Sequence, residues 1–577
     1  MVENKPGKKE KKKLIARLGK KQVISVGIIS SVAIAVIISG IYFFTIPEVR
    51  GDEIIIGLND APNSIDPLKN PTPKYVNLII IDQIAEGLFA YDQNKTDTPI
   101  TPNLALNGSW SLDHLNFTCT LRSNVTFHDG TPFNATAVKW NFDRIYKFIE
   151  IMPQYDTMYW YPAYLDSEGN PIINRTEIVN DYTVKFVLNK PYVPIRDLLT
   201  LWNSYILSPN STPDDEFIDI RTGKLVGTGP FIFDSCEVDF YGESLKTDMH
   251  ANPNYWGGTP SINILSFLAL NSGTERMERM LSGELSYTMG PRDDSVLDIY
   301  RNTPGITVVP KTRLNLFYLG MNNNTIDVTM RRAISYAFNY TRHIEEYWGG
   351  HAERARSPLS NRMRYSNWED FDVPDYNITR ARQILKDANW PGTSGLTAND
   401  NITTGNEWEM IANSSTPLRI YNFSTCTSWM EFVANLTIAD LKQIGVKVNI
   451  LKMGGVEFFD KLYEGEHDIF TAGWGVTRTD PVDVINPLYS SKVDGVSNYI
   501  NFNDTKVQQW MEQALEEFNE TKREQLYFKI QQRFIEQLNP FLWLAHPIDY
   551  DIWDSDVKGI PIDGAPLRLI LKYCYLT

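Results

Sequence analysis

Cysteine and histidine are scarce in this sequence, which has four cysteines and seven histidines among 577 residues. Four cysteines are too few to form a disulfide scaffold in a chain of this length, and no two of them have the close spacing of a zinc site. The sequence also has no His-Glu-x-x-His motif, no Gly-x-Ser-x-Gly motif and no Walker-type phosphate loop. We therefore expect a protein that is not an enzyme and that needs neither a metal nor a cofactor.

Basic residues are scarce outside the first fifty positions. The chain has 55 Lys and Arg against 70 Asp and Glu, which gives a net charge of −15. About ten basic and three acidic residues lie in positions 1–50, so the remainder carries a charge of about −22. Proteins bind nucleic acids through clustered Lys and Arg, and a body this acidic excludes nucleic acid as a partner.

No compositional bias of a fibrous or disordered chain is present. Glycine (35) and proline (32) have ordinary frequencies, and 42% of the residues are hydrophobic. Such a composition excludes collagen-like repeats and wholesale disorder. The length corresponds to roughly four domain-sized units, or fewer large ones.

The N-terminal region has the pattern of a membrane anchor. Residues 1–22 form a basic segment, and residues 23–44 carry no charged side chain. At ~1.5 Å per residue an apolar helix of this length spans about 33 Å, enough for a bilayer core of ~30 Å. The basic flank places residues 1–22 in the cytoplasm and the rest of the chain outside. A cleaved signal peptide is the alternative, although its apolar part is usually shorter, roughly 7–15 residues.

Asparagine-linked glycosylation motifs agree with an exterior location. Chance would give about five or six Asn-x-Ser/Thr sequons in a chain of this composition. The sequence has sequons at Asn94, Asn107, Asn116, Asn124, Asn134, Asn174, Asn210, Asn323, Asn339, Asn377, Asn401, Asn413, Asn422, Asn435, Asn503 and Asn519. The excess predicts a glycosylated exterior surface, with compositional bias as the alternative.

Hydrophobic periodicity predicts helices and strands that alternate along the chain. Alternating apolar residues predict strands at 52–58, 115–122, 182–188 and 446–451. Helical periodicity predicts helices at 135–148, 275–281, 329–338, 378–389 and 429–444, and one or two within 506–537. The polar, glycine-rich stretch 390–417 is typical of a surface insertion. This mixture indicates an α/β class.

Nine short motifs in a fixed order carry a family resemblance. They are SIDP (64–67), LNFTCTLRSNVTFHDGTPFNATAVKWNFDRI (115–145), GTGPF (227–231), NPNYWGG (252–258), LSGEL (281–285), FYLGMN (317–322), MRRAISYAFN (330–339), IADLKQIGVKVNI (438–450) and AGWGVTRTDP (472–481). Over nearly the whole chain, from about 52 to 554, the sequence resembles the extracellular solute-binding proteins of ABC importers, oligopeptide/dipeptide/nickel-binding class (family 5).

The resemblance implies a two-lobed fold with a hinge. The first lobe would comprise 51–320 with an inserted subdomain at about 75–204, and the chain would return to it at 541–577. The second lobe would comprise 321–540, with crossovers near 318–322 and 540–546. Cys236 and Cys574 would both lie in the first lobe, and we expect that they pair.

The resemblance also implies a function. The protein would be a membrane-anchored receptor that captures a peptide or glycoside between its lobes and delivers it to an ABC permease, with ATP hydrolysed by another subunit. The alternatives are an oligosaccharide receptor and a sensor or surface binding protein without transport. An extracellular hydrolase is a more distant alternative.

We expect the ligand site to lie around a position at which this sequence differs from the peptide-binding members of the family. In peptide-binding members, the segment matching 472–481 carries an aspartate three residues after its tryptophan, and this aspartate pairs with the peptide's α-ammonium. Here the tryptophan is Trp474 and the third residue after it is Thr477. Asp480 is a candidate replacement, although an Asp-Pro pair is more typical of a turn. The predicted ligand-binding residues are Ala472, Gly473, Trp474, Thr477, Asp480, Tyr318 and Asn322. We expect recognition of a free α-ammonium to be weakened or relocated.

Overall fold

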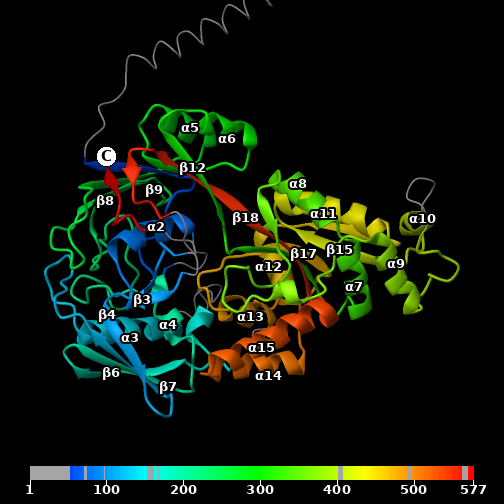
Figure 1. The fold of residues 1–577 in the computed structure, drawn as a ribbon, viewed down its shortest axis with the longest axis horizontal. Coiled ribbons are helices and arrows are strands. Elements are labelled where there is room, and N and C mark those ends of the chain that lie inside the picture. Colours follow the sequence, from blue (N-terminus) through cyan, green and yellow to red (C-terminus); the bar gives the residue numbers. More distant parts are fainter. Residues whose placement is uncertain are drawn as a thin grey trace, which may run out of the picture.

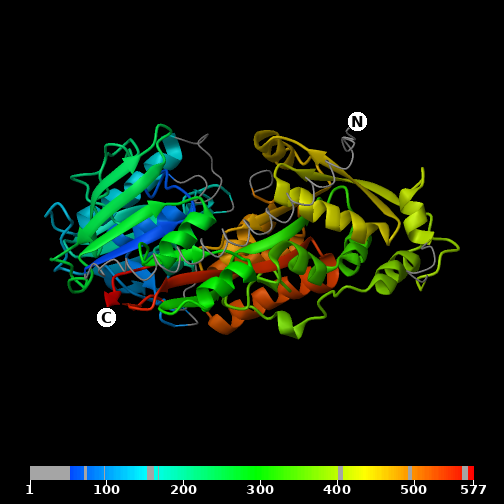
Figure 2. The ribbon, with the colours of Figure 1, turned by 90° about the horizontal axis from the view of Figure 1, so that it is seen from above.

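The fold is known from a computed structural model of the whole chain. It describes residues 52–69, 74–95, 98–151, 161–166, 168–399, 407–491, 497–561 and 569–577. Figures 1 and 2 show two α/β lobes side by side, bridged by one long strand near the C-terminus. The predicted α/β class is confirmed.

The strands are mostly short, with one exception of 14 residues. They are β1 (Glu53–Leu58), β2 (Phe89–Tyr91), β3 (Ile100–Pro102), β4 (Ala105–Trp110), β5 (Asn116–Leu121), β6 (Ile173–Asn180), β7 (Thr183–Leu188), β8 (Phe231–Val238), β9 (Ser244–Ala251), β10 (Ile264–Ala269), β11 (Tyr287–Gly290), β12 (Ile306–Thr312), β13 (Leu316–Met321), β14 (Ala352–Arg354), β15 (Arg419–Thr425), β16 (Val446–Lys452), β17 (Ile469–Trp474), β18 (Phe541–Asp554), β19 (Val557–Lys558) and β20 (Tyr575–Leu576).

Helices lie between these strands along most of the chain. They are α2 (Tyr75–Ile84), α3 (Ala135–Ile151), α4 (Ile195–Leu198), α5 (Gly273–Leu281), α6 (Asp294–Arg301), α7 (Val328–Ala337), α8 (Tyr340–Trp348), α9 (Ile378–Asp387), α10 (Glu407–Asn413), α11 (Ser428–Lys442), α12 (Gly455–Tyr463), α13 (Val482–Tyr489), α14 (Thr505–Glu516) and α15 (Glu520–Gln532). Short turns are η1 (Tyr161–Tyr164), η2 (Trp202–Ser204) and η3 (Trp368–Asp370), and α15 continues into the π-helical turn η5 (Arg533–Leu538).

One sheet of twelve strands runs through both lobes. Its order is β16-β15-β17-β13-β18-β11-β1-β10-β9-β8, and β12 and β14 also pair with β18. The start of β18 pairs with β13 and β14, whereas its end pairs with β11 and β12. We call the elements from β1 to β12, with the chain from 548 onward, the first lobe. The second lobe comprises β13 to η5 with the start of β18.

A separate four-stranded sheet, β4-β5-β7-β6, lies in the first lobe and is packed against α3. Its strands alternate buried and half-buried residues, as in Asn116–Leu121 and Thr183–Leu188. This alternation buries one face against α3 and leaves the other nearer solvent. The predicted strands at 115–122 and 182–188 are confirmed.

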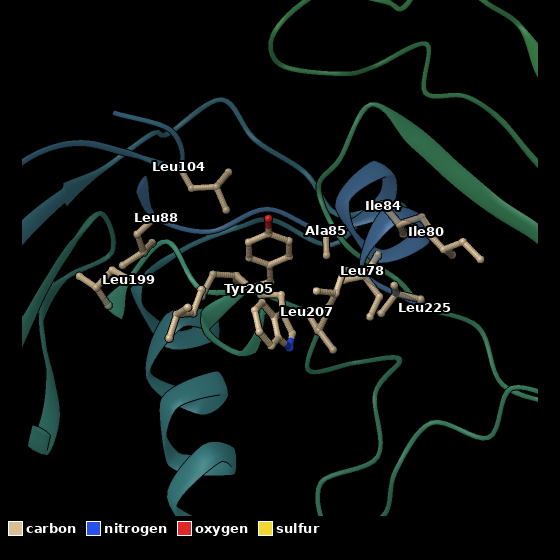
Figure 3. Packing of buried hydrophobic residues seen from close by; sticks show 14 of the residues in the cluster. Leu78, Ile80, Ile84, Ala85, Leu88, Leu104, Leu199, Tyr205, Leu207 and Leu225 are labelled. Carbon is tan, nitrogen blue, oxygen red and sulfur yellow. The ribbon is translucent and has the colours of Figure 1, made fainter. Parts of the chain in front are cut away.

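Each lobe has its own hydrophobic core. The largest cluster of the first lobe gathers α2, α3 and the four-stranded sheet, and it also takes in residues from the C-terminus. Figure 3 shows its centre, where Tyr205 lies among leucines and isoleucines around α2. The second lobe has two clusters, one on each side of β13 and β17. Separate cores are what allow two lobes to move as rigid bodies.

Side-chain caps and turn glycines fix where several elements begin and where the chain turns. The Asp327 side chain accepts hydrogen bonds from the first amides of α7, and Asn377 does the same for α9. Gly130, in the turn after β5, has φ +81°, as a turn glycine requires. Gly227 and Gly229 permit a close approach, because a Cβ on either would lie within 2.6 Å of the Ile84 carbonyl oxygen.

Two expectations about packing are wrong. All four cysteines are free, so Cys236 and Cys574 do not pair. The stretch 390–417 is not purely a surface insertion, because Trp408 is fully buried and its Nε1 donates to the Thr397 carbonyl at 2.8 Å. Burial of a large indole anchors this stretch to the second lobe.

The predicted anchor at 23–44 lies outside the described residues. Within the part of the chain that the structure describes, no helix is both long and apolar enough to cross a bilayer.

Candidate functional site

The candidate site lies where β17 ends, near the boundary between the lobes. β17 pairs antiparallel with β13, which places Ala472 opposite Tyr318 and Gly473 opposite Phe317. Gly473 is exposed, and a Cβ there would lie 3.3 Å from the Phe317 ring. The strand pairing therefore brings the segment Ala472–Trp474 alongside β13, where Tyr318 lies. Ligand binding by these residues stays a prediction.

Asp483, in the first turn of α13, shapes the loop after β17. Its carboxylate accepts hydrogen bonds from Thr477 N at 2.5 Å, Thr477 Oγ1 at 3.1 Å and Arg478 N at 3.0 Å. It also accepts from Arg478 Nε at 2.8 Å, and its main-chain carbonyl accepts from Trp474 Nε1 at 2.8 Å. Thr477 is thus bound within its own loop, and Asp483 is saturated by donors from the same segment.

Asp480 forms a buried ion pair with Arg523 of α15. The two guanidinium nitrogens of Arg523 lie 2.6 and 3.0 Å from the carboxylate oxygens of Asp480, which is fully buried. Asp480 also accepts from Val482 N at 3.0 Å, as expected of an Asp-Pro turn that opens a helix. Burial raises the pKa of Asp480, but Arg523 outweighs burial and leaves this pKa below its ordinary value.

The inserted region of the first lobe faces this loop with tyrosines and an aspartate. Tyr91 donates to Asp197 Oδ1 at 2.8 Å and accepts from Thr479 N of the second lobe at 3.3 Å. Asp197 lies 3.6 Å from the guanidinium of Arg364, which also belongs to the second lobe. Burial raises the pKa of Asp197 above its ordinary value, and Arg364 opposes that rise.

Arg478 is buried at the same boundary. Burial lowers the pKa of its guanidinium, but Asp483 and then Tyr192 of the first lobe outweigh burial and leave the pKa raised. Its Nη1 has no hydrogen-bond partner among the described residues. The boundary thus holds three arginines and three aspartates, Arg364, Arg478, Arg523, Asp197, Asp480 and Asp483.

Tyr318 and Asn322 lie in the interior. Tyr318 is 2% exposed, and its ring packs edge-on against Phe541 with centroids 4.6 Å apart. Asn322 is fully buried, and its Nδ2 donates to the carbonyls of Gly465 and His467 at 3.0 and 2.8 Å. In this conformation both amide hydrogens of Asn322 are used within the second lobe. A ligand contact by either residue stays a prediction.

Several residues at the boundary were not singled out from the sequence. Tyr91, Asp197 and Arg364 lie far apart in the chain, and no local motif marks them. Only their packing brings them to one place, so sequence spacing carried no signal for them. The described residues contain no group of three or more His, Cys, Asp or Glu that could hold a metal ion.

Comparison with known proteins decides the family. A model of the bacterial extracellular solute-binding proteins, family 5 (middle region), matches residues 99–495. The chain belongs to this family. It is 28% identical over 520 residues to di/tripeptide-binding protein 2 of Pseudomonas aeruginosa, which covers 86% of this chain and 90% of the relative. It is 26% identical over 502 residues to heme-binding protein A of Haemophilus influenzae, covering 83% and 84% of the two chains.

Solved structures of the same fold are also similar. HbpA2 from Haemophilus parasuis matches with a TM-score of 0.73 and 22% identity, covering 91% of this chain and 100% of that chain. The periplasmic binding protein DppA from Helicobacter pylori, solved with the peptide STSA, matches with a TM-score of 0.70 and 22% identity, covering 91% and 98%. The predicted two-lobed α/β fold and the predicted family are therefore confirmed.

Proposed function

We propose that this chain is the membrane-anchored, extracellular substrate-binding receptor of an ABC-type importer, which captures an oligopeptide-like ligand between its lobes and passes it to a permease. The observation that carries the proposal is that the chain belongs to family 5. Its relatives include a di/tripeptide-binding protein that aligns with this chain over 90% of its own length. The basic segment and apolar span at 1–44 support the anchor. Tethering keeps a receptor at high local concentration near its permease.

The proposed lobe limits lie near the middle of the sheet. We propose a first lobe of 51–320 with its subdomain at 75–204, a second lobe of 321–540, and a return of the chain at 541–577. The strands β13 and β18 support a division near these limits, since they are neighbours where the two halves of the sheet meet. By strand pairing alone, 316–321 and 541–547 belong with the second lobe. Ligand capture would then be a hinge closure of one lobe on the other.

The charges around Trp474 bear on the ligand's chemistry. Asp480 is paired with Arg523, Asp483 with Arg478, and Asp197 with Tyr91 and Arg364. Each carboxylate near the loop is therefore neutralised by a partner within the chain, and Thr477 offers only a hydroxyl. A ligand's α-ammonium would gain little here, because a charge-assisted bond requires an ionised acceptor that is not already saturated. Blocked or internal peptides fit this site better than a short peptide with a free amino terminus.

Co-purification and calorimetry test the proposal. Mass spectrometry of the ligand released from protein purified from its own membranes should find an intact peptide, which also tests the expectation that no catalysis occurs. A carbohydrate in its place would contradict a peptide receptor and support the oligosaccharide alternative. A candidate permease can be reconstituted in vesicles and supplied with the loaded receptor. A lack of transport by every such permease would support a sensor instead.

The terminal preference is tested with one peptide in three forms: free, N-acetylated and C-amidated. We expect N-acetylation to cost less than about 1 kcal/mol, or roughly a five-fold change in Kd. The C-amidated form is the matched control, because it leaves the amino terminus unchanged. A loss above about 3 kcal/mol on N-acetylation alone would show that a carboxylate does bind the ammonium.

A further inference from the structure

The glycosylation sequons that the structure describes lie at the surface of the protein. Fifteen of the sixteen sequon asparagines are among the residues whose burial the structure describes, and none of the fifteen is buried. Five are half-buried. The ten that are exposed are Asn94, Asn107, Asn124, Asn174, Asn210, Asn377, Asn413, Asn435, Asn503 and Asn519.

Some asparagines outside sequons are buried, unlike the described asparagines inside sequons. The buried asparagines among the described residues are Asn77, Asn103, Asn141, Asn203, Asn252, Asn322, Asn498 and Asn539, and none of them is followed by x-Ser/Thr with x other than proline. Composition bias alone would scatter sequons over buried and exposed asparagines alike. The segregation therefore argues against the compositional explanation that the sequence left open. A buried asparagine has no room for an attached sugar, so only surface sequons can carry one.

The amide nitrogens of several exposed sequons make no hydrogen bond, whereas Asn435 Nδ2 donates one to the Glu431 carbonyl at 2.8 Å. Within the described residues the Nδ2 atoms of Asn94, Asn124, Asn210 and Asn503 donate no hydrogen bond, and all four side chains are exposed outside helices and strands. Asn377 and Asn519 cap helices α9 and α15 through Oδ1, an interaction that leaves Nδ2 unused. A glycosyl amide keeps its carbonyl oxygen, so these caps would survive attachment of a sugar.

One sequon provides an internal contrast. Asn323 is half-buried, and its Nδ2 donates to the carbonyls of Met321 and Ile500, both at 3.0 Å. Attachment of a sugar replaces one of the two amide hydrogens. The Asn323 sequon therefore cannot be modified without losing a hydrogen bond beside the crossing strand β13.

We propose that this protein carries N-linked glycans at its exposed sequons and none at Asn323. In the transfer, Nδ2 forms a bond to the anomeric carbon of a sugar. The bond from that carbon to the phosphate oxygen of a polyisoprenyl-phosphate-linked oligosaccharide breaks, and one amide proton leaves with the phosphate. The family's extracellular location exposes the chain to such donors. This proposal does not depend on which ligand the lobes bind.

Glycopeptide mass spectrometry of the full chain, purified from the membranes of its own host, tests the proposal. We expect sugar mass on the peptides that contain exposed sequons and an unmodified peptide around Asn323. The sequon-free stretch 211–322 supplies unmodified internal standards. Unmodified mass at all ten exposed sequons would overturn the proposal. Glycan occupancy at Asn323 equal to that at the exposed sites would overturn the claim that hydrogen bonding of Nδ2 excludes a glycan there.

A pair of variants tests a single sequon without touching its asparagine. Thr126→Ala removes the hydroxyl of the Asn124 sequon, whereas Thr126→Ser keeps it, and Thr126 is itself exposed. Thr126→Ala should lower the intact mass by one glycan, and Thr126→Ser should leave the mass unchanged except for the substitution. An equal glycan mass in both variants would contradict modification at Asn124.

Discussion

At the lobe boundary, oppositely charged side chains form ion pairs in the protein interior. Asp480 and Arg523 are 0% and 2% exposed, and they make two short hydrogen bonds with each other. The pair as a whole has little net effect on stability, because desolvation offsets attraction. Removal of one partner is different, since it leaves an uncompensated charge in the interior. These residues are therefore more sensitive to substitution than any local sequence pattern suggests.

We predict that Asp480→Asn lowers the free energy of unfolding of the second lobe by about 3–5 kcal/mol at pH 7. Because Asp480 has a lowered pKa, its stabilising contribution is present above the ordinary carboxyl pKa and is lost as the pH falls through the folded value. The difference between wild type and variant in urea unfolding should shrink as the pH is lowered below 3.8. Asp143→Asn, in the exposed pair with Lys139, is the matched control and should cost less than about 1 kcal/mol. Equal costs for the two variants would contradict a buried pair.

At the scale of elements, the two lobes touch on the side away from the crossing strands. Val193 N, after β7, donates to the Leu515 carbonyl of α14 at 2.8 Å. Phe518, between α14 and α15, stacks on His114 with centroids 3.7 Å apart, and Trp110 packs edge-on against it. Together with Asp197 and Arg364, these contacts join the inserted sheet to the α14–α15 hairpin (Figure 1). This contact holds the lobes together independently of a ligand.

Arg364→Gln should loosen that contact. Arg364 is 34% accessible whereas Asp197 is 4% accessible, and the two lie 3.6 Å apart. Because Tyr91 still donates to Asp197 in the variant, the loss of the ion pair should cost at most about 1 kcal/mol, or roughly a five-fold shift toward open forms. Hydrogen exchange of the Thr479 amide, which donates to Tyr91 across the boundary, should quicken by a similar factor. Arg380→Gln, an exposed change on α9 in the same lobe, is the control. Indistinguishable exchange in the two variants would mean that the ion pair does not hold the lobes.

Elements were predictable where the signal was local. The helix expected at 135–148 is α3, and the strand expected at 446–451 is β16, because periodicity and caps act within a few residues. The partners of the site were not predictable. Asp480 and Arg523 are 43 residues apart, and Asp197 and Arg364 are joined only by the docking of two lobes. Trp408 was misjudged because polar neighbours hid a single buried indole.

The whole molecule has features of a hinge where the strands cross. The pairing of β13 with β18 shifts register between Phe317 and Tyr318. On the other crossover, the π-helical turn η5 ends at Leu538 and is followed by Asn539, which has a left-handed φ of +40°. Bulges and π-turns interrupt regular hydrogen bonding, so they are places where a backbone can bend.

We predict that a tight ligand closes the lobes by rotation about 317–322 and the region of Pro540. Small-angle X-ray scattering should show a smaller radius of gyration with ligand than without, approaching the ~25 Å of a compact chain of this length. A mixture with a peptide that does not bind is the control. The ligand must first be shown by calorimetry to bind. Superimposable scattering curves with and without that ligand would then refute the hinge.

The position of β18 has a consequence for how the protein is made. This strand is near the end of the chain, yet it lies in the middle of the sheet, between β13 and β11. During synthesis, β13 and β11 each lack their β18 partner until residues 541–554 have been made, so each half of the sheet has an unpaired edge until then. Such long-range closure is slow, and open edges promote aggregation. A nascent chain that stalls before residue 541 can complete neither half of the sheet, so the assembly of both lobes depends on the synthesis of residues 541–554.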